Sequence, residues 1–436
     1  MFASIQNIFS IPELRRRILF TLGMLAVYRV GCHVPTPGVD AQVLAKFFQG
    51  TQGTLLGMVS AFTGGALKRM TVFALGIMPY ISASIILQLL GVVFEPVERL
   101  TKEGAQGQKV ITRWTRYGTV ILSVIQGAGI AVGLQTMRGP AGAPVVPNPG
   151  VGFILMTVIT LTAGTAFIMW LGEQITERGI GNGISLIIFA GIVANMPGAI
   201  FNTLRLLHTG AMSPMIMILI GAVMVVVTAA IVFMEQGHRR VPIHYAKRVV
   251  GMRSYGGQSS HLPLKVNMAG VIPPIFASSI IMFPATVANL VDVPWVHTVA
   301  SMMSPSHLAY NVVYVALIIF FCYFYTAVTF NPIDVADNIK NQGGYIPGIR
   351  PGKATAEYID TVLGRITFAG ALYVAAVCVL PTILIGRFNV PFYFGGTSLL
   401  IVVGVGLDTA QQIEAHLISR SYEGFMTGVT LGGRRS

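Results

Sequence analysis

Long apolar runs separated by short polar segments dominate the pattern of hydrophobic positions along this chain. The run from Met268 to Leu290 is long enough to cross a bilayer, and it directly follows the basic segment from Arg239 to Lys265. Comparable runs recur, so the sequence predicts a polytopic all-α membrane protein. The ten predicted spans cover residues 18–34, 71–94, 117–136, 151–171, 184–202, 212–234, 268–290, 308–330, 366–386 and 394–412.

The distribution of basic residues predicts the orientation of these spans. If the amino terminus is cytoplasmic, most of the 29 Lys and Arg fall in cytoplasmic segments. Cytoplasmic loops of membrane proteins carry such an excess, so both termini are expected inside. The exceptions are Arg29, Lys46, Lys68, Arg69, Arg138, Arg205 and Arg387.

Ten spans with a long basic loop after the sixth divide into five and five. Two five-helix halves in one membrane must have opposite topology, so span counting favours two pseudo-symmetric, inverted halves. No clear sequence identity relates them. The predicted organisation is an amphipathic segment at 1–17, a first half at 18–207, a second half at 208–419 with cytoplasmic loops at about 235–267 and 331–365, and a cytoplasmic tail at 420–436.

One apolar segment, residues 55–67, is too short to cross the hydrocarbon. Gly64, Gly65, Lys68 and Arg69 separate it from the second predicted span. It is therefore either an interfacial helix or a re-entrant one, and the second interpretation requires a cavity in the protein.

Composition agrees with a membrane protein, because 53% of the residues are hydrophobic, only 10% are charged, and the mean hydropathy is +0.71. The three cysteines, Cys32, Cys322 and Cys378, are odd in number and far apart. They indicate small buried residues rather than a disulfide framework or a metal site.

The spans carry almost no ionisable residue near their midpoints, which argues against proton or cation coupling. No zinc-protease, nucleophile-elbow or Walker motif is present, so the sequence favours neither an enzyme nor a cofactor. The glycine-rich stretch Gly179–Gly183 follows a helix rather than a strand, which favours a tight turn over a phosphate loop.

Four of the spans carry isoleucines of interest, and in two of these spans the isoleucines are paired at helical spacing. Ile77 and Ile81 lie one turn apart, as do Ile184 and Ile188, and Ile275 and Ile401 lie in the seventh and tenth spans. Isoleucines in membrane helices ordinarily face lipid, and composition does not say which way these point.

Six long stretches closely resemble the SecY family, the central subunit of the bacterial protein-conducting channel. They are residues 73–90, 115–122, 177–193, 245–284, 331–359 and 396–409. The resemblance is collinear over nearly the whole chain. It implies ten helices in two inverted halves with a pore between them, in the bacterial cytoplasmic (inner) membrane, and a channel that is not an enzyme.

The resemblance also implies roles for particular residues. The waist of the pore would be an aliphatic ring of Ile77, Ile81, Ile188, Ile275 and Ile401, with Ile184 nearby. A short re-entrant plug helix would occupy about 55–67, with Leu55, Met58, Val59 and Phe62 in it and Gly64 and Gly65 as its hinge. The lateral gate would include Ser82, Gln88, Gln126, Ser278, Ser279 and Phe283.

The basic loops would carry the partner contacts implied by the resemblance. The residues expected to meet a motor or a ribosome are Arg239, Arg240, Lys247, Arg248, Arg253, Arg350 and Tyr422. The positive-inside rule alone would also require many of these cations. The expected partners are the small subunits SecE and SecG, the motor ATPase SecA, ribosomal RNA, signal sequences with nascent secretory or membrane proteins, and membrane lipids.

Two alternatives remain at this point. An inverted-repeat secondary transporter for a small solute would need polar groups at the midplane, although Pro79, Pro273 and Pro274 could break helices as such folds require. An insertase without translocation activity would not need a plug.

Overall fold

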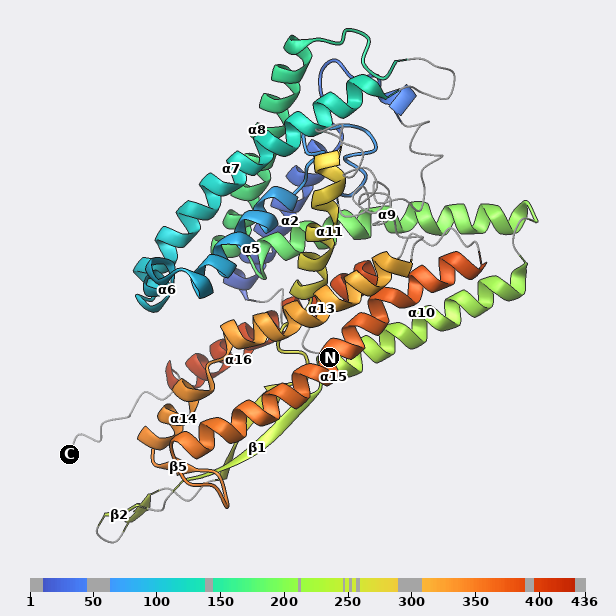
Figure 1. Ribbon diagram of the computed structural model, residues 1–436. Coiled ribbons are helices and arrows are strands. Elements are labelled where there is room, and N and C mark those ends of the chain that lie inside the picture. Colours follow the sequence, from blue (N-terminus) through green and yellow to red (C-terminus); the bar gives the residue numbers. More distant parts are fainter. Residues whose placement is uncertain are drawn as a thin grey trace, which may run out of the picture. The chain divides into compact units, whose positions relative to one another are not determined.

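A computed structural model of the chain describes residues 11–44, 63–137, 144–210, 213–245, 248–250, 253–255, 259–288, 308–388 and 396–427. The described residues are mostly helical and belong to two compact units (Figure 1). The first unit contains Met1–Asn202, Met282–Ser304 and Val405–Ser436, and the second contains Thr203–Ile281 and Pro305–Gly404.

Six helical stretches within the described ranges are long and apolar enough to cross a membrane: Ala105–Thr136, Val151–Arg178, Gly183–Arg205, Pro214–Glu235, Ala309–Asn341 and Lys353–Leu380. This confirms a multi-pass helical protein. The count of ten spans stays a prediction.

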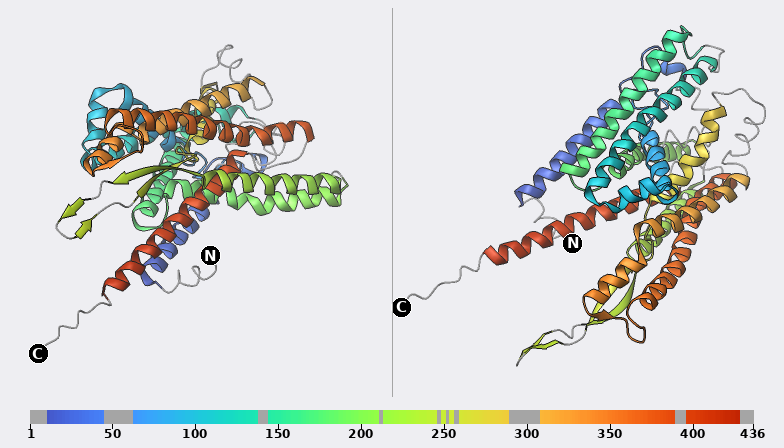
Figure 2. Two further views of the ribbon diagram at one scale, coloured as in Figure 1. Left: turned by 90° about the horizontal axis from the view of Figure 1, so that it is seen from below. Right: turned by 60° about the vertical axis from the view of Figure 1, so that its left-hand side comes forward.

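In the first unit, α7 (Ala105–Thr136) packs along α8 (Val151–Arg178) and along α5 (Met78–Val93) (Figure 1). The blue helix α2 (Pro12–Gly31) lies beside the green α8 (Figure 2). The helix α9 (Gly183–His208) begins just after α8 ends. Part of the apolar core lies where residues near Leu67 and Leu75 meet Leu134 and Leu161.

The second predicted span, 71–94, is helical only from Met78 onward, because turns occupy the residues before it. Gly76 has a positive φ of 58°, and Pro79 lies in the first turn of α5, where proline favours a helix start. At Phe94 the chain bends by 104° into α6 (Glu95–Lys102), which also has a proline in its first turn.

The second unit contains the following helices: α10 (Pro214–Glu235), α11 (Ile272–Ala288) as far as Ile281, α13 (Leu308–Thr329), α14 (Pro332–Asn341), α15 (Lys353–Phe388) and the start of α16 (Gly396–Thr427). α13 packs along α15, and the Tyr314 hydroxyl lies 2.9 Å from Thr397 Oγ1 on α16. Asn267 joins the end of α10 to the turn before α11, because its Nδ2 donates to Glu235 Oε1 at 2.6 Å and to the Gly270 carbonyl.

The two loops expected after the sixth and eighth spans contain strands, so the all-α prediction was incomplete there. β1 (His238–Tyr245) pairs antiparallel with β4 (Ser259–Lys265) and with β5 (Gly344–Tyr345) in the order β4-β1-β5 (Figure 1). A separate hairpin contains β2 (Arg248–Val250) and β3 (Arg253–Tyr255).

A second apolar core joins these two loops. Val241, Ile243 and Leu264 of the sheet pack with Ile339 of α14 and with Ile359 of α15. β1, β4, β5, α14 and the first turns of α15 therefore form one packed body, here named the sheet module.

Candidate pore, gate and docking residues

Five of the six predicted pore isoleucines are buried within the protein. Side chains that face lipid would instead be exposed on its surface. The exposed fractions are 6% for Ile77, 6% for Ile81, 4% for Ile188, 7% for Ile275 and 0% for Ile401. On α10, by contrast, Ile231 is the only buried residue, and several of the helix's apolar side chains, such as Met215, Ile218 and Val225, are exposed.

The sixth isoleucine, Ile184, is only half-buried and lies against α8. A Cβ added to Gly172 of α8 would lie 3.2 Å from Ile184 Cγ1. The first unit thus carries Ile77, Ile81, Ile184 and Ile188, and the second carries Ile275 and Ile401. Their convergence into one ring stays a prediction.

The glycine-rich stretch between α8 and α9 is a tight turn, as predicted. Gly181 has a φ of 86°, and Asn182 caps α9 by accepting from the Ile184 and Ser185 amides at 3.1 and 3.3 Å. The side chain, rather than a ligand, therefore satisfies the first amides of α9.

The amides within this turn are also engaged by the protein. The Ile180 amide donates to Thr21 Oγ1 of α2 at 3.1 Å, and the Gly181 amide donates to Gln412 Oε1 of α16 at 3.0 Å. These bonds leave both amides unavailable to a phosphate, and they fasten the turn to α2 and α16.

The predicted gate residues lie on α5, α7 and α11. Ser82, Gln88 and Gln126 are half-buried in the first unit. Gln88 Nε2 donates to Ser84 Oγ at 3.2 Å, while its Oε1 is buried without a hydrogen-bond partner in the described part of the chain. A buried amide oxygen without a hydrogen bond costs free energy. A donor from another helix would therefore stabilise Gln88.

On α11, the Ser278 and Ser279 hydroxyls each donate to the Ile275 carbonyl at 2.8 Å. Their donors are thus used within their own helix, as is common for serine in membrane helices. The Phe283 side chain lies outside the described residues.

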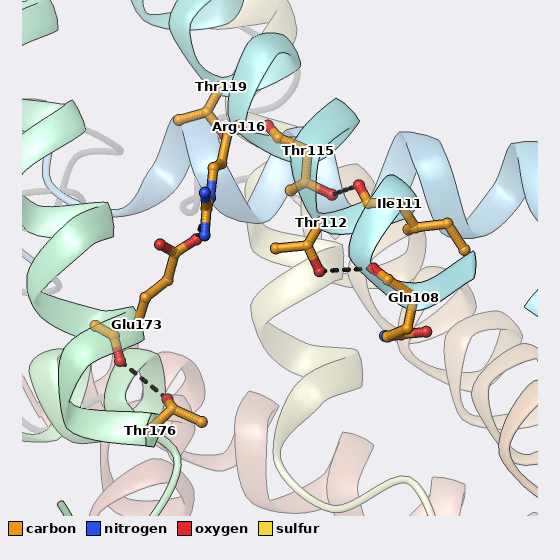
Figure 3. A network of polar contacts seen from close by, with 9 residues as sticks. Gln108, Ile111, Thr112, Thr115, Arg116, Thr119, Glu173 and Thr176 are labelled. Atoms are coloured by element: carbon orange, nitrogen blue, oxygen red, sulfur yellow. Dashed lines mark hydrogen bonds and ion pairs between the residues drawn. The ribbon is translucent and has the colours of Figure 1, made fainter. Parts of the chain in front are cut away.

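An ion pair that sequence reasoning missed joins α7 to α8. Arg116 Nε lies 2.8 Å from Glu173 Oε1, and the Glu173 side chain is only 16% exposed (Figure 3). On the same stretch of α7, the Thr112 and Thr115 hydroxyls donate to the carbonyls one turn earlier. The pair therefore fixes the position of α7, one of the predicted gate helices, against α8.

We expect Glu173→Gln to lower the free energy of unfolding by about 1 kcal/mol, because it removes one charge of a partly exposed pair that joins two helices. The measurement is thermal unfolding in lipid nanodiscs. Glu95→Gln is the control, since it breaks an exposed pair with Arg99 within a single helix. Equal losses in both variants would contradict a role for the Arg116 pair in helix packing.

The predicted docking cations are exposed where the structure describes them. Arg239 and Arg240 lie on β1 of the sheet module, and Arg350 lies in the turn before α15. Gly348 and Gly352 flank Arg350 with φ of 82° and 99°, and Thr355 Oγ1 donates to the Arg350 carbonyl at 3.0 Å. The backbone of this turn is therefore held while its guanidinium faces solvent.

Several predicted residues lie outside the described part. They are Lys247, the side chains of Arg248, Arg253 and Tyr422, and the plug residues Leu55, Met58, Val59 and Phe62. The two hinge glycines are described. Gly64 and Gly65 form a turn with φ of 65° and 82°.

Among the described residues, no cluster of three or more His, Cys, Asp or Glu that could hold a metal ion occurs. The three cysteines are buried and unpaired with one another, as predicted.

Comparison with known proteins gives matches over nearly the whole chain. The family model SecY matches residues 71–410. The protein translocase subunit SecY of Escherichia coli K12 is 51% identical over 425 residues, covering 97% of this chain and 96% of that protein. The subunit of the same name from Aquifex aeolicus is 45% identical over 423 residues, covering 97% and 99%.

Solved structures with low sequence identity share the fold. A structure of a protein conducting channel has a TM-score of 0.64 at 17% identity and covers 95% of this chain and 97% of its own. Sec61 in the canine ribosome-channel complex from the endoplasmic reticulum has a TM-score of 0.62 at 16% identity, with the same coverage.

Proposed function

Because this chain belongs to the SecY family of protein translocase subunits, we propose that it is a protein-conducting channel. Unfolded secretory polypeptides cross the membrane through it, and hydrophobic segments leave it sideways into the bilayer. The near full-length match to translocase subunits carries this conclusion. The secondary transporter is not favoured, since these relatives are translocase subunits.

The proposed waist of the channel is the ring of buried isoleucines. A β-branched side chain is stiff at χ1 and forms no hydrogen bond with water or ions. Ile77, Ile81 and Ile188 from the first unit would meet Ile275 and Ile401 from the second. Such a ring can yield around any peptide without binding it, and its apolar surface resists ions when no peptide is present.

The proposed lateral gate uses α5 and α7 on one side and α11 and α13 on the other. Interhelical hydrogen bonds in membranes contribute about 1 kcal/mol each, so a few polar contacts can close a gate that a hydrophobic signal sequence opens. The unpaired Gln88 oxygen supports this assignment, because it offers an acceptor to such a contact.

The sheet module is the proposed docking body on the cytoplasmic side of the bacterial inner membrane. Exposed Arg239, Arg240 and Arg350 suit the phosphates of ribosomal RNA and also the acidic grooves of a motor ATPase such as SecA. SecE and SecG are the proposed small membrane subunits. Two of the solved structures with this fold are of channel complexes with ribosomes, which supports a ribosome as one partner.

A cysteine crosslink tests the proposed channel. We expect Ile275→Cys to form a disulfide with a cysteine in a stalled secretory chain, because the nascent peptide would pass through the ring. The native cysteines are first replaced by alanine. Val225→Cys on α10 is the control, since Val225 is 70% exposed on the surface expected to face lipid.

A crosslink at position 225 as strong as at position 275, or none at 275 with an engaged chain, would contradict the proposed path.

A further inference from the structure

The segment that leads into the pore helix α5, residues 63–77, is fixed to the loop after α2 by backbone hydrogen bonds. We name it the entry segment. The Thr36 amide donates to the Met70 carbonyl at 2.8 Å, and the Val72 amide donates to the Val34 carbonyl at 3.0 Å. A segment without regular secondary structure is thereby held in one conformation.

Close packing against glycines adds to this fixation. The Phe73 ring lies over Gly31 of α2 and stacks on Tyr28 at a centroid distance of 6.0 Å. On the other side, a Cβ added to Gly164 of α8 would lie 2.0 Å from the Val72 carbonyl oxygen. The absence of side chains at both glycines lets the entry segment approach α2 and α8 this closely.

The amino-terminal end of the entry segment is held by a charged side chain. Arg29 Nη1 of α2 donates to the Gly64 carbonyl at 3.1 Å, in a partly buried position. Gly64 also faces α9, where a Cβ added to it would lie 3.0 Å from Gly191 Cα. Hydrogen bonds from charged donors are stronger than neutral ones, so Arg29 is a firm anchor for this turn.

One further contact connects the Arg29–Gly64 bond to the start of the pore helix α5. A Cβ added to Gly76 would lie 2.8 Å from Thr63 Cγ2, and Gly76 directly precedes Ile77. The two ends of the entry segment therefore touch. A movement of Thr63 and Gly64 would displace the start of α5, which carries Ile77 and Ile81.

We propose that Arg29 is a positioning residue that holds Gly64 and, through the contact of Thr63 with Gly76, the start of α5 with its pore isoleucines. This rests on the proposed function, because it assigns Arg29 to the resting state of that channel. In the positive-inside pattern Arg29 is one of the few cations expected on the outer side, and this bond gives it a role there.

The test compares Arg29→Gln with Arg69→Gln in the full chain, reconstituted with its partner subunits in vesicles. Both changes remove one outer positive charge, but Arg69 is exposed and donates no hydrogen bond to Gly64. We expect Arg29→Gln to raise the resting leak of a small solute by about tenfold, the change that loss of one charged hydrogen bond produces in an equilibrium. Arg29→Lys should restore part of the seal, and Arg69→Gln should match the parent.

A second measurement keeps the test valid if Arg29→Gln weakens folding. Thr63 is 2% exposed, so Thr63→Cys, in a chain with Cys32 replaced by alanine, should react slowly with an external thiol reagent. Arg29→Gln should speed this reaction about tenfold, while buried Cys322 and Cys378 stay unreactive in folded protein.

The proposed Arg29 anchor and the proposed channel can each be contradicted without the other. If the parent shows the Ile275 crosslink but Arg29→Gln matches Arg69→Gln in both leak and Thr63→Cys reactivity, the anchor is overturned and the channel stands. If no crosslink forms at Ile275, the proposed channel fails whatever Arg29 does.

Discussion

Arg350→Glu should lower the affinity of the channel for the proposed motor ATPase by about 30-fold, because reversing a charge at an interface costs about 2 kcal/mol or more. The glycine-flanked turn and the Thr355 bond hold the backbone, so the turn itself loses little conformational entropy when Arg350 binds a partner. ATP-driven import of a precursor into vesicles should fall in parallel at limiting motor concentration.

Lys353→Glu is the matched control, because Lys353 is also exposed and begins α15 three positions later. We expect it to weaken binding much less, with the residual effect removed by salt. Arg350→Lys should recover only part of the affinity, since an ammonium lacks the planar fork of arginine. Equal losses for positions 350 and 353 would mean that only the total charge matters.

Gly164→Ala should destabilise the first unit by about 3 kcal/mol, the upper part of the range for overpacked sites. Its new methyl group would lie 2.0 Å from the Val72 carbonyl oxygen, and backbone cannot move aside as a flexible side chain can. Thermal unfolding in lipid nanodiscs should show the loss as a lower midpoint.

Gly152→Ala lies on the same helix and meets nothing within 4 Å, so it should leave the midpoint unchanged or slightly raised. If both alanine variants unfold alike, the close approach of the entry segment to α8 is not part of the folded protein.

Hydropathy predicted the apolar parts of the long helices but not their ends. α7 begins at Ala105 rather than at 117, and α15 begins at Lys353 rather than at 366. A charged residue limits a hydrocarbon span, but it does not end a helix once the chain has reached water. Polar first turns such as those of α7 therefore extend the helix beyond the expected span.

The strands of the sheet module were not predicted from the sequence, because their segments contain proline and many basic residues. β1 contains Pro242, which lacks an amide hydrogen, but β5 pairs with β1 only at His244 and Tyr245. Pro242 lies opposite His261 of β4, and on its other side β5 does not reach it, so the ladder there loses no bond to the missing amide, and proline is tolerated at such unpaired positions. The alternation of buried Val241 and Ile243 with exposed neighbours was the available signal.

Family resemblance supplied positions for the candidate site, and their roles stay predictions, whereas contacts between two distant segments had no signal in the sequence. The burial of Ile81 and Ile401 agrees with the family pattern, although periodicity alone did not separate them from lipid-facing residues. Arg116 and Glu173 are 57 positions apart and meet only because α7 packs on α8. Arg29 bonds to a backbone carbonyl, which no sequence motif marks.

The apolar core of the sheet module has a mechanical consequence. Because Ile243 and Leu264 from one loop are packed with Ile339 and Ile359 from the other, the two loops cannot be pulled apart without exposing that core to water. A motor that pushes on Arg350 would thus load the ends of α10, α13 and α15 together. Within the second unit, the force would therefore act on several helices at once rather than on one flexible loop.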